Sequence, residues 1–201
     1  MGARIAVLAS GSGTNLQALL DEPAVGERVA VVVSDRGEAG ALQRAEERGI
    51  PALHLDPGAH ASREDYDAAL LDVLRERADL VCLAGFMRIL SAPVVRAFER
   101  RMLNVHPSLL PAFPGAHAVR DALAWGVKVT GVTVHLVDEE VDHGPIVLQE
   151  AVPVAAEDDE RSLHARIQQV EHRLFPRAAA LLADDRLRVE GRTVVVVGEE
   201  R

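Results

Sequence analysis

Short apolar runs alternate with amphipathic stretches along the first half of the chain. The apolar runs have the length of buried strands and lie at 4–9, 29–33, 52–55, 80–84 and 102–105. The stretches between them show helical spacing at 15–20, 38–48, 63–77 and 93–99. Strands that alternate with helices are typical of a parallel sheet covered on both faces. The pattern predicts an α/β fold with a doubly wound, mostly parallel sheet flanked by helices and a Rossmann-like N-terminal half.

The second half of the chain departs from this rhythm. Residues 106–115 hold three prolines and no periodicity, so we expect an ordered loop there, and such a loop in a compact domain suggests function. Strands at 127–137 and 146–154 flank an acidic turn at 138–144. A helix at 158–182 and a hairpin of strands at 186–189 and 193–197 follow. No linker or repeat interrupts the sequence, so we expect a single domain over residues 1–201.

Charge and composition narrow the class of partner. The formal net charge is −9, which disfavours wide contact with nucleic acid because such binding relies on Lys and Arg. No apolar run approaches the length of a membrane span. Cys82 is the single cysteine and lies in an apolar run, which argues against a disulfide framework and suits a reducing compartment. We expect a cytoplasmic protein that acts on small molecules, with no nucleic acid and no membrane as partners.

A glycine-rich turn follows the first expected strand. The turn begins like a dinucleotide-binding fingerprint, but the third glycine position holds Leu16. Backbone amides after Gly13, at the start of the next helix, suit one phosphate monoester, and Thr14 and Asn15 supply further donors. A tight turn without a ligand would explain the same residues, so the two interpretations stay open at this point.

Asn104 and His106 lie at the end of the fifth expected strand. Residues two apart on an extended chain project to the same face, so the amide and the imidazole should meet at the carboxyl end of this strand. Ligands bind at that end in open α/β sheets. An amide donor beside an imidazole suits a reaction that develops an oxyanion and needs a proton. The alternative is a pair that satisfies loop carbonyls.

Longer motifs give the chain a family resemblance. The segments NVHPSLLP at 104–111 and FPG at 113–115 resemble the signature of glycinamide ribonucleotide formyltransferases. Further motifs follow the family order, with SGSGTN at 10–15, AGFMRIL at 84–90, GVTVH at 131–135 and VDHGP at 141–145. Because these segments span nearly the whole sequence, the chain is identified as similar to this family over most of its length, and the formyltransferase fold is the expected one.

The resemblance implies an activity and a set of site residues. The activity is transfer of the formyl group of 10-formyltetrahydrofolate to the glycyl amine of glycinamide ribonucleotide, in purine synthesis, by direct transfer and without a metal. The catalytic residues would be Asn104, His106 and Asp142. The ribonucleotide would contact Gly13, Thr14, Asn15 and Glu171, and the folate would contact Arg63, Met87, Arg88, Ile89, Leu90 and Asn104.

The resemblance also divides the labour along the chain. Residues from about 1 to 100 would bind the phosphate, and those from about 101 to 201 would carry catalysis and folate binding. Asp142 would raise the pKa of His106, since a nearby carboxylate stabilises a charged imidazole. Glu171 would meet the glycyl amine, although an exposed helical Glu would explain that residue as well. Either a monomer or a homodimer is compatible with the sequence.

Two positions depart from the family pattern. Ala112 stands where many relatives carry Lys or another polar residue, and His143 stands where a small residue is common. Neither change removes a catalytic group. His143 lies beside Asp142 in the chain and is expected either to compete for that carboxylate or to alter the folate loop.

Several other functions fit parts of the sequence. Asp35 ends the second strand, where a nicotinamide enzyme binds ribose. Zinc would need His106, His135, Asp142 and His143 together, but neither paired-cysteine nor His-Glu-x-x-His spacing supports a metal site. Methionyl-tRNA formyltransferases and formyl-folate hydrolases share the Asn, His and Asp plan but usually carry an added domain. A non-catalytic nucleotide sensor would not need an acid and a carboxylate beside it.

Overall fold

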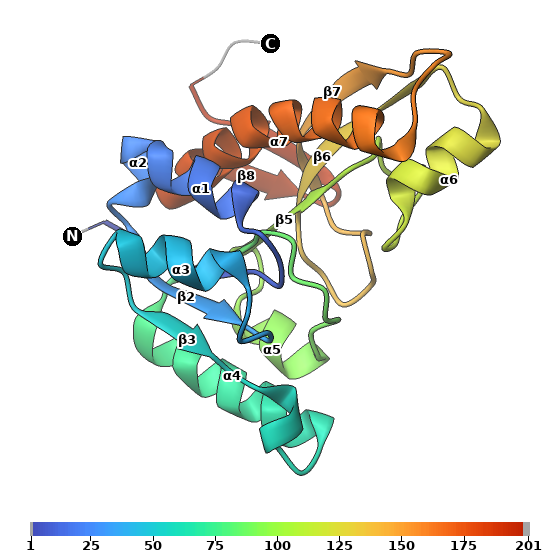
Figure 1. Cartoon of the computed structure of the whole chain (residues 1–201). Helices are drawn as coiled ribbons and strands as arrows, with labels where there is room; N and C mark the ends of the chain where they lie inside the picture. Colours follow the sequence, from blue (N-terminus) through green and yellow to red (C-terminus); the bar gives the residue numbers. More distant parts are fainter. Residues whose placement is uncertain (1, 199–201) are drawn as a thin grey trace.

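The computed structural model describes residues 2–198, which fold around one central sheet (Figure 1). The strand order is β3-β2-β1-β4-β5-β6-β7-β9-β8. Strands β1 to β5 pair in parallel and comprise Ile5–Leu8, Val29–Ser34, Ala52–His54, Leu80–Leu83 and Met102–His106. Strands β6 to β9 comprise Val129–Leu136, Ile146–Pro153, Leu187–Glu190 and Thr193–Val196. The expected α/β class, with a parallel N-terminal half, is confirmed.

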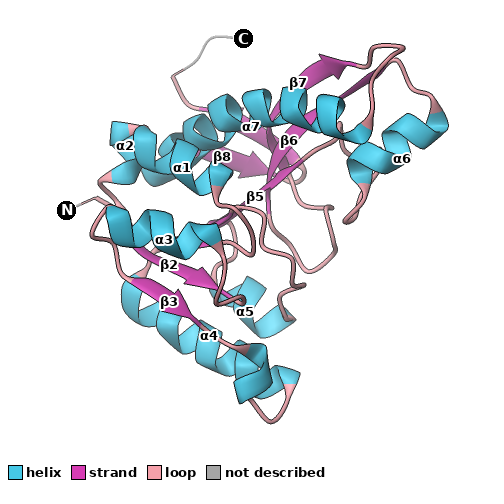
Figure 2. Cartoon of the chain, in the orientation of Figure 1, coloured by secondary structure: helices cyan, strands magenta, loops and turns pink. Residues whose placement is uncertain are grey.

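Helices cover both faces of the sheet (Figure 2). One face carries α1 (Thr14–Asp21), α2 (Pro23–Gly26), α3 (Gly40–Glu47), α6 (Ala118–Trp125) and α7 (Glu160–Ala183). The other face carries α4 (Arg63–Arg77), which follows a short 3-10 turn at Pro57–Ala59, and α5 (Ala92–Ala97). In the central strand β1, Val7 packs with the first group and Leu8 with the second. Burial on both faces is the reason why the parallel strands are continuous apolar runs.

Local side-chain chemistry sets the start of the two longest helices. Asp159 accepts a hydrogen bond from the Ser162 amide (2.7 Å), and Ser162 Oγ accepts one from the Asp159 amide (3.0 Å). This reciprocal pair satisfies donors that the first turn of α7 would otherwise leave open. Ser62 caps α4 in the same way by accepting from the Asp65 amide (3.0 Å). The acidic stretch before α7 is therefore explained as a helix start.

The C-terminal half of the sheet is mixed. Strand β6 pairs antiparallel with both β5 and β7, while β9 pairs with β7 in parallel through Ile146 and Thr193. The expected hairpin is present as β8 and β9, shifted by one residue at the start of β8. Helix α6 was not among the expected elements; it begins after His117, whose side chain makes no capping hydrogen bond. The other unexpected elements, α2 and the 3-10 turn, are shorter still.

The proline-rich loop after β5 is fastened to β6 and β7. Thr133 Oγ1 donates to the Ser108 carbonyl (2.7 Å) and accepts from the Leu110 amide (3.0 Å). Gln149 Nε2 donates to the Leu110 carbonyl (2.8 Å) and to Thr133 Oγ1 (2.9 Å). These contacts hold backbone groups that a loop without regular pairing cannot satisfy by itself. The loop is ordered because two side chains of the sheet replace the missing ladder.

Two isosteric substitutions on β6 test this fastening. Thr133→Val should lower the free energy of unfolding by about 1–3 kcal/mol, because buried loop groups lose their partner. Thr130 is the matched control, since it is equally buried on β6 but its Oγ1 has no hydrogen-bond partner among residues 2–198. Thr130→Val should leave stability unchanged or raise it. Urea unfolding of the three proteins gives the comparison, and equal losses in both variants would contradict the proposed anchor.

Candidate active site

A cavity of about 380 Å³ lies at the carboxyl ends of β4 and β5. Three segments line it: the turn after β4 from Gly85 to Leu90, the end of β5 from Asn104 to Pro107, and the loop after β6 from Val137 to Asp142. His135 and Gly115 complete the lining near the centre. The position agrees with the rule that open α/β sheets bind ligands beyond the carboxyl ends of their strands.

His106 is buried in this cavity with both ring nitrogens facing oxygen atoms. Its Nε2 lies 2.8 Å from the Phe113 carbonyl, and its Nδ1 lies 3.3 Å from Asp142 Oδ2. Asp142 in turn accepts a hydrogen bond from the Gly115 amide (2.7 Å). The proline-rich loop and the loop after β6 thus meet at this imidazole, and the predicted pair of His106 and Asp142 is in contact.

Asn104 connects Asp142 to a second histidine. Asn104 Nδ2 lies 3.1 Å from His135 Nε2 and 3.4 Å from Asp142 Oδ1. His135 Nδ1 lies 2.9 Å from the Leu136 carbonyl, so Nδ1 carries the hydrogen and Nε2 accepts from the amide. Sequence reasoning did not assign His135 to the catalytic group. The signal was its place in the GVTVH segment, but only the pairing of β5 with β6 brings it opposite Asn104.

Burial and charge act in opposite directions on the two ionisable groups. Burial would raise the pKa of Asp142, but His135, the Gly115 amide and His106 together lower it below its ordinary value. Burial is also the largest effect on His106 and lowers its pKa, which Asp142 and the Phe113 carbonyl raise only in part. The net direction for His106 is downward. The Asp142 carboxylate acts with the expected sign, since it raises the pKa of His106 against the effect of burial.

The segment from Met87 to Leu90 forms the outer wall of the cavity. Two of its apolar side chains, Met87 and Ile89, are each 63% exposed, and both line the cavity. The backbone is held from below, where Ser10 Oγ accepts from the Met87 amide (2.9 Å) and donates to Asp35 (2.6 Å). Exposed apolar side chains on a fixed backbone suit a flat apolar ligand. Asp35 is engaged in this support, which accounts for the residue without a nicotinamide.

Helix α4 supports the same segment from the side. Arg63 donates from Nη2 to the Ile89 carbonyl (2.7 Å), and the Arg88 guanidinium lies over the Tyr66 ring at 4.8 Å from its centroid. Burial raises the pKa of Tyr66 to about 12, so its hydroxyl stays protonated. Arg63 does not line the cavity, and its contact in the structure is with the wall. Among the predicted folate residues it is the one that the structure does not bring to the cavity.

The glycine turn and helix α7 bring the predicted ribonucleotide residues together. Gly13 has a φ of 75°, and a Cβ there would lie 2.7 Å from the Ala41 backbone. Asn15 Nδ2 donates to Glu171 Oε2 (3.0 Å) across 156 residues of chain. Glu171 is only 4% exposed, and burial raises its pKa. The alternative of an exposed helical Glu is therefore wrong.

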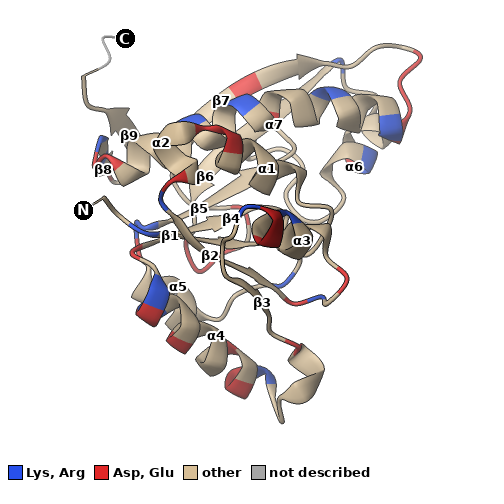
Figure 3. Ribbon diagram, turned by 60° about the vertical axis from the view of Figure 1, so that its left-hand side comes forward, with Lys and Arg blue, Asp and Glu red and all other residues tan. Residues whose placement is uncertain are grey.

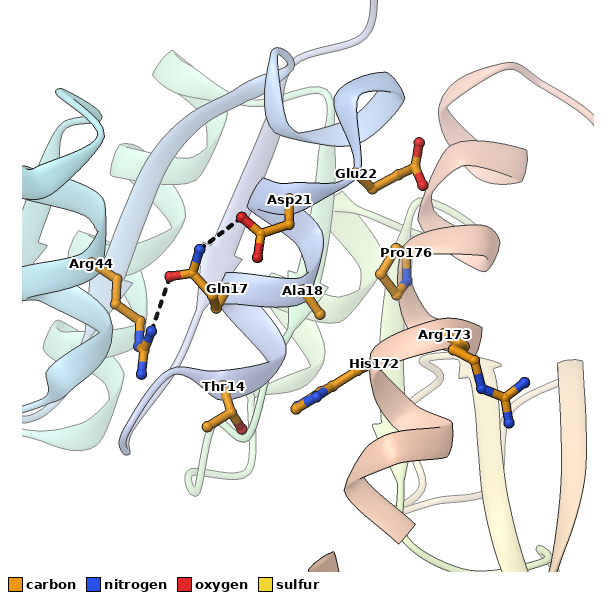
Figure 4. A pocket seen from close by; sticks show the side chains of 9 residues that line it. All are labelled: Thr14, Gln17, Ala18, Asp21, Glu22, Arg44, His172, Arg173 and Pro176. Carbon is orange, nitrogen blue, oxygen red and sulfur yellow. Dashed lines mark hydrogen bonds between the residues drawn. The ribbon is translucent and has the colours of Figure 1, made fainter. Parts of the chain in front are cut away.

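A second cavity, of about 620 Å³, lies between α1 and α7 next to Thr14 (Figure 4). Its charged side chains are largely paired with neighbours. Arg44 donates to Gln17, whose amide donates to Asp21, and Arg173 pairs with Glu150 at 2.7 Å. Arg173 is thus paired with a carboxylate, whereas the partners of Arg44 are neutral groups, the Gln17 amide and the Ser12 carbonyl.

The two departures from the family pattern have simple local structures. Ala112 is exposed, and its backbone carbonyl accepts from Ser108 Oγ, so this contact does not depend on the Ala112 side chain. His143 pairs through Nδ1 with Asp138 (2.8 Å) and not with Asp142. The expected competition for Asp142 is wrong, because His143 points to the other end of its loop. Within residues 2–198, the structure shows no group of three or more His, Cys, Asp or Glu side chains that could hold a metal ion.

An α/β fold with an amide, an imidazole and a carboxylate in a cavity at its strand ends defines a class of enzymes that act on small molecules. Comparison with known proteins narrows the class. A formyl transferase family model matches residues 3–179. The chain belongs to the formyl transferase family, and the resemblance indicated by its motifs is confirmed.

Individual relatives agree with this assignment. The chain is 49% identical over 198 residues to the phosphoribosylglycinamide formyltransferase of Mycobacterium tuberculosis, with 96% of this chain and 91% of that protein covered. It is 50% identical over 187 residues to the trifunctional purine biosynthetic protein adenosine-3 of Drosophila melanogaster, covering 90% of this chain but only 14% of that protein. The solved structure of glycinamide ribonucleotide transformylase 1 from Symbiobacterium toebii superposes with a TM-score of 0.94 at 54% identity, covering 98% and 94% of the two chains.

None of the helices in the described part of the chain is both long and apolar enough to cross a bilayer.

Removing the Asp142 charge tests the electrostatic account of the site. Asp142→Asn should lower the pKa of His106 further, because the carboxylate is a group that raises it against burial. Glu140→Gln is the control, since Glu140 is a carboxylate of the same loop that does not act on His106. A pH titration of the His106 imidazole by NMR measures both. A pKa that stays constant or rises in Asp142→Asn would contradict the account.

Proposed function

We propose that this protein transfers the formyl group of 10-formyltetrahydrofolate to the glycyl amine of glycinamide ribonucleotide, as the names of its relatives state for those proteins. The observation that carries the proposal is the convergence of Asn104, His106 and Asp142 in a cavity whose outer wall is the segment from Met87 to Leu90. Formyl transfer from folate needs a proton donor for the leaving nitrogen, an amide donor for the oxyanion and an apolar wall for the flat folate ring.

The chemistry proceeds by direct attack. The neutral glycyl amine adds to the formyl carbon, a tetrahedral intermediate forms, and the bond to N10 of tetrahydrofolate breaks as N10 takes a proton. The attacking nitrogen gives up its extra proton, and the imidazole that has protonated N10 takes up one proton in return, so the protons balance. No bond between the formyl group and the protein is needed.

His106 delivers the proton from Nε2. Its Nδ1 faces Asp142, which orients the ring as the carboxylate does in a catalytic triad. Nε2 faces the Phe113 carbonyl, so the bound substrate replaces this carbonyl as the partner of Nε2. The lowered pKa makes protonated His106 a stronger acid, which favours proton transfer to a weakly basic nitrogen.

Asn104 stabilises the oxyanion with the less committed of its two N–H groups. One N–H donates to His135 Nε2 at 3.1 Å, and the other faces Asp142 Oδ1 at the longer distance of 3.4 Å. The longer contact is the weaker one, so it is the one that turns to the formyl oxygen as charge develops. His135 keeps the amide in place during this exchange.

The two substrates approach the reaction centre from different sides. The folate lies against Met87, Arg88, Ile89 and Leu90, with Arg63 supporting this wall through the Ile89 carbonyl. The ribonucleotide phosphate meets the backbone of Gly13, Thr14 and Asn15 at the start of α1, where amides point outward. Glu171, held by Asn15, meets the glycyl amine or the ribose beside it.

The division of the chain follows from this arrangement. We keep residues 1–201 as one domain, with phosphate binding in the first half and catalysis in the second. The folate wall comes from the first half and the loop opposite it from the second, so both halves hold the folate.

Small molecules remain the partners, and acidic and basic residues are interspersed along α4 and α7, which disfavours a wide polyanion contact (Figure 3). The buried free thiol of Cys82 suits the reducing cytoplasm.

One assay tests the proposal against its closest rival, a formyl-folate hydrolase. Absorbance of the folate product is followed with and without glycinamide ribonucleotide. Product formation that depends on the ribonucleotide, with stoichiometric formyl ribonucleotide, supports the transferase. Release of formate at the same rate in the absence of the ribonucleotide would show a hydrolase instead.

Substitutions of His106 and Asp142 test the catalytic roles proposed for these two residues. His106→Ala and Asp142→Asn should each lower kcat by about 100- to 1,000-fold, since they remove transition-state stabilisation. The affinity for the ribonucleotide should stay nearly unchanged in both, because neither residue touches the phosphate loop. Steady-state kinetics with both substrates varied gives the comparison, and near-normal turnover in either variant would remove that residue from the mechanism.

The proposed ribonucleotide site around Asn15 and Glu171 can be tested separately. Asn15→Ala should raise the KM for the ribonucleotide about 10- to 100-fold, because buried Glu171 loses its hydrogen bond to the amide. Gln17→Ala, two positions further along the same helix, removes contacts to Arg44 and Asp21 and should change this KM little. Gly13 is a poor probe, since any Cβ there collides with Ala41 and would disturb folding. Equal KM values in the Asn15 and Gln17 variants would argue against the site.

A further inference from the structure

The C-terminal hairpin reaches the catalytic loop through one residue. Arg192 lies in the turn between β8 and β9, and its Nη2 donates to the His143 carbonyl. Its Nη1 lies 3.1 Å from His143 Nε2 and 3.5 Å from Nδ1. Because Nδ1 of this ring is hydrogen-bonded to the Asp138 carboxylate, Nε2 is the ring nitrogen that accepts from the guanidinium. Arg192 thus donates from two nitrogens to two acceptors of His143, which suits its planar, forked side chain.

His143 passes this contact to the start of its loop. Its Nδ1 donates to Asp138 Oδ2 (2.8 Å), and Asp138 Oδ1 accepts from the Glu140 amide (3.1 Å). Arg192 therefore touches the main chain and the side chain of His143, and through that side chain the first turn of the loop. The loop is spanned from Asp138 to His143 by a single chain of contacts.

The loop needs such support because of its backbone. Asp142, next to His143, has a φ of 53°, in the left-handed region that non-glycine residues rarely adopt. Gly144 must be glycine, since a Cβ there would lie 1.8 Å from the Leu136 carbonyl. Contacts on either side must hold Asp142 in this conformation. The Gly115 amide donates to the Asp142 carboxylate, and Arg192 donates to the carbonyl of the next residue, His143.

Other fastenings of the loop come from different elements. Glu139 pairs with Arg96 of α5 at 2.6 Å, on the opposite side of the loop from the hairpin. The hairpin itself joins the sheet through the pair of Ile146 and Thr193, immediately after Arg192. It also lies outside residues 3–179, the part that the family model matches. The contact thus joins His143 to an element beyond the matched region.

We propose that Arg192 is a positioning residue, which holds the loop from Asp138 to His143 in the conformation that places Asp142 beside His106 and closes the folate side of the cavity. The inference rests on the proposed function for its kinetic consequence, but not for its structural one. Arg192 touches neither substrate nor reacting atoms, and it acts through His143.

The structural arm of the test needs no activity. Hydrogen exchange of peptides covering residues 138–145 is compared in the wild-type protein, Arg192→Ala and Arg188→Ala. Arg188 is an exposed arginine of β8 in the same hairpin and serves as the matched control. Exchange in the loop should become about two- to fivefold faster in Arg192→Ala and stay unchanged in Arg188→Ala, as expected for loss of one partly exposed contact. Equal exchange in the two variants would overturn the proposal, whatever the enzyme does.

The kinetic arm asks whether the loop contact matters for the folate. Arg192→Ala should raise the KM for formyl-folate about two- to fivefold while the KM for the ribonucleotide stays constant. A purely structural loss of active protein would lower kcat and leave both KM values alone. Arg192→Lys keeps the charge but cannot donate to the His143 carbonyl and to Nε2 from two separate nitrogens, so it should behave as Arg192→Ala.

The outcomes separate the two hypotheses. If the wild-type protein shows no ribonucleotide-dependent transfer but Arg192→Ala still exchanges faster in the loop, the proposed function is refuted and the loop contact stands. Normal transfer with an unchanged folate KM in Arg192→Ala would overturn the positioning role. Full recovery of the wild-type folate KM in Arg192→Lys would assign the effect to charge alone and contradict a role for the two-nitrogen contact.

Discussion

The antiparallel pairing of β5 with β6 is the constraint on which the site depends. Its register sets Asn104 opposite His135 and His106 opposite Thr133. Side chains alternate between the faces of a strand, so a slip of one residue would turn this whole set away from the cavity. The same register aligns the Asn104 amide with His135 and anchors the loop after His106 through Thr133. One pairing therefore orders the Asn104 amide and the loop that faces His106.

Burial and charge are balanced at the centre of this arrangement. Removing His106 from water lowers its pKa more than Asp142 raises it. The Asp142 carboxylate keeps a lowered pKa despite its own partial burial, because donors surround it. The pair thus combines a persistent negative charge with an imidazole that releases its proton readily. Such a combination suits an acid that must protonate a poor leaving group, and it arises from the depth of the cavity as much as from the residue types.

The walls around the pair are held by elements far apart in the chain. Ser10 at the end of β1 and Arg63 of α4 fix the segment after β4. Arg96 of α5 and Arg192 of the hairpin fix the loop after β6. Each wall carries exposed apolar side chains that make few contacts of their own, such as Met87, Ile89 and Val141. Hydrogen bonds to the backbone leave these side chains free to contact a ligand.

The alternating apolar runs and helical stretches determined the α/β class, because local periodicity and burial on both faces leave a direct trace in the sequence. The motif around Asn104 and His106 likewise indicated the chemistry, since two residues on one strand need no long-range information to share a face. The tertiary structure alone decided that His135 supports Asn104, that Glu171 is buried against Asn15, that His143 turns to Asp138, and that burial outweighs Asp142 at His106. Two of these outcomes join residues 31 and 156 positions apart, one is a choice between two carboxylates of the same loop, and the last depends on how much water a packed cavity excludes. A local sequence pattern does not show which side chains meet or how much water the folded cavity excludes. Both are therefore known only from the folded chain.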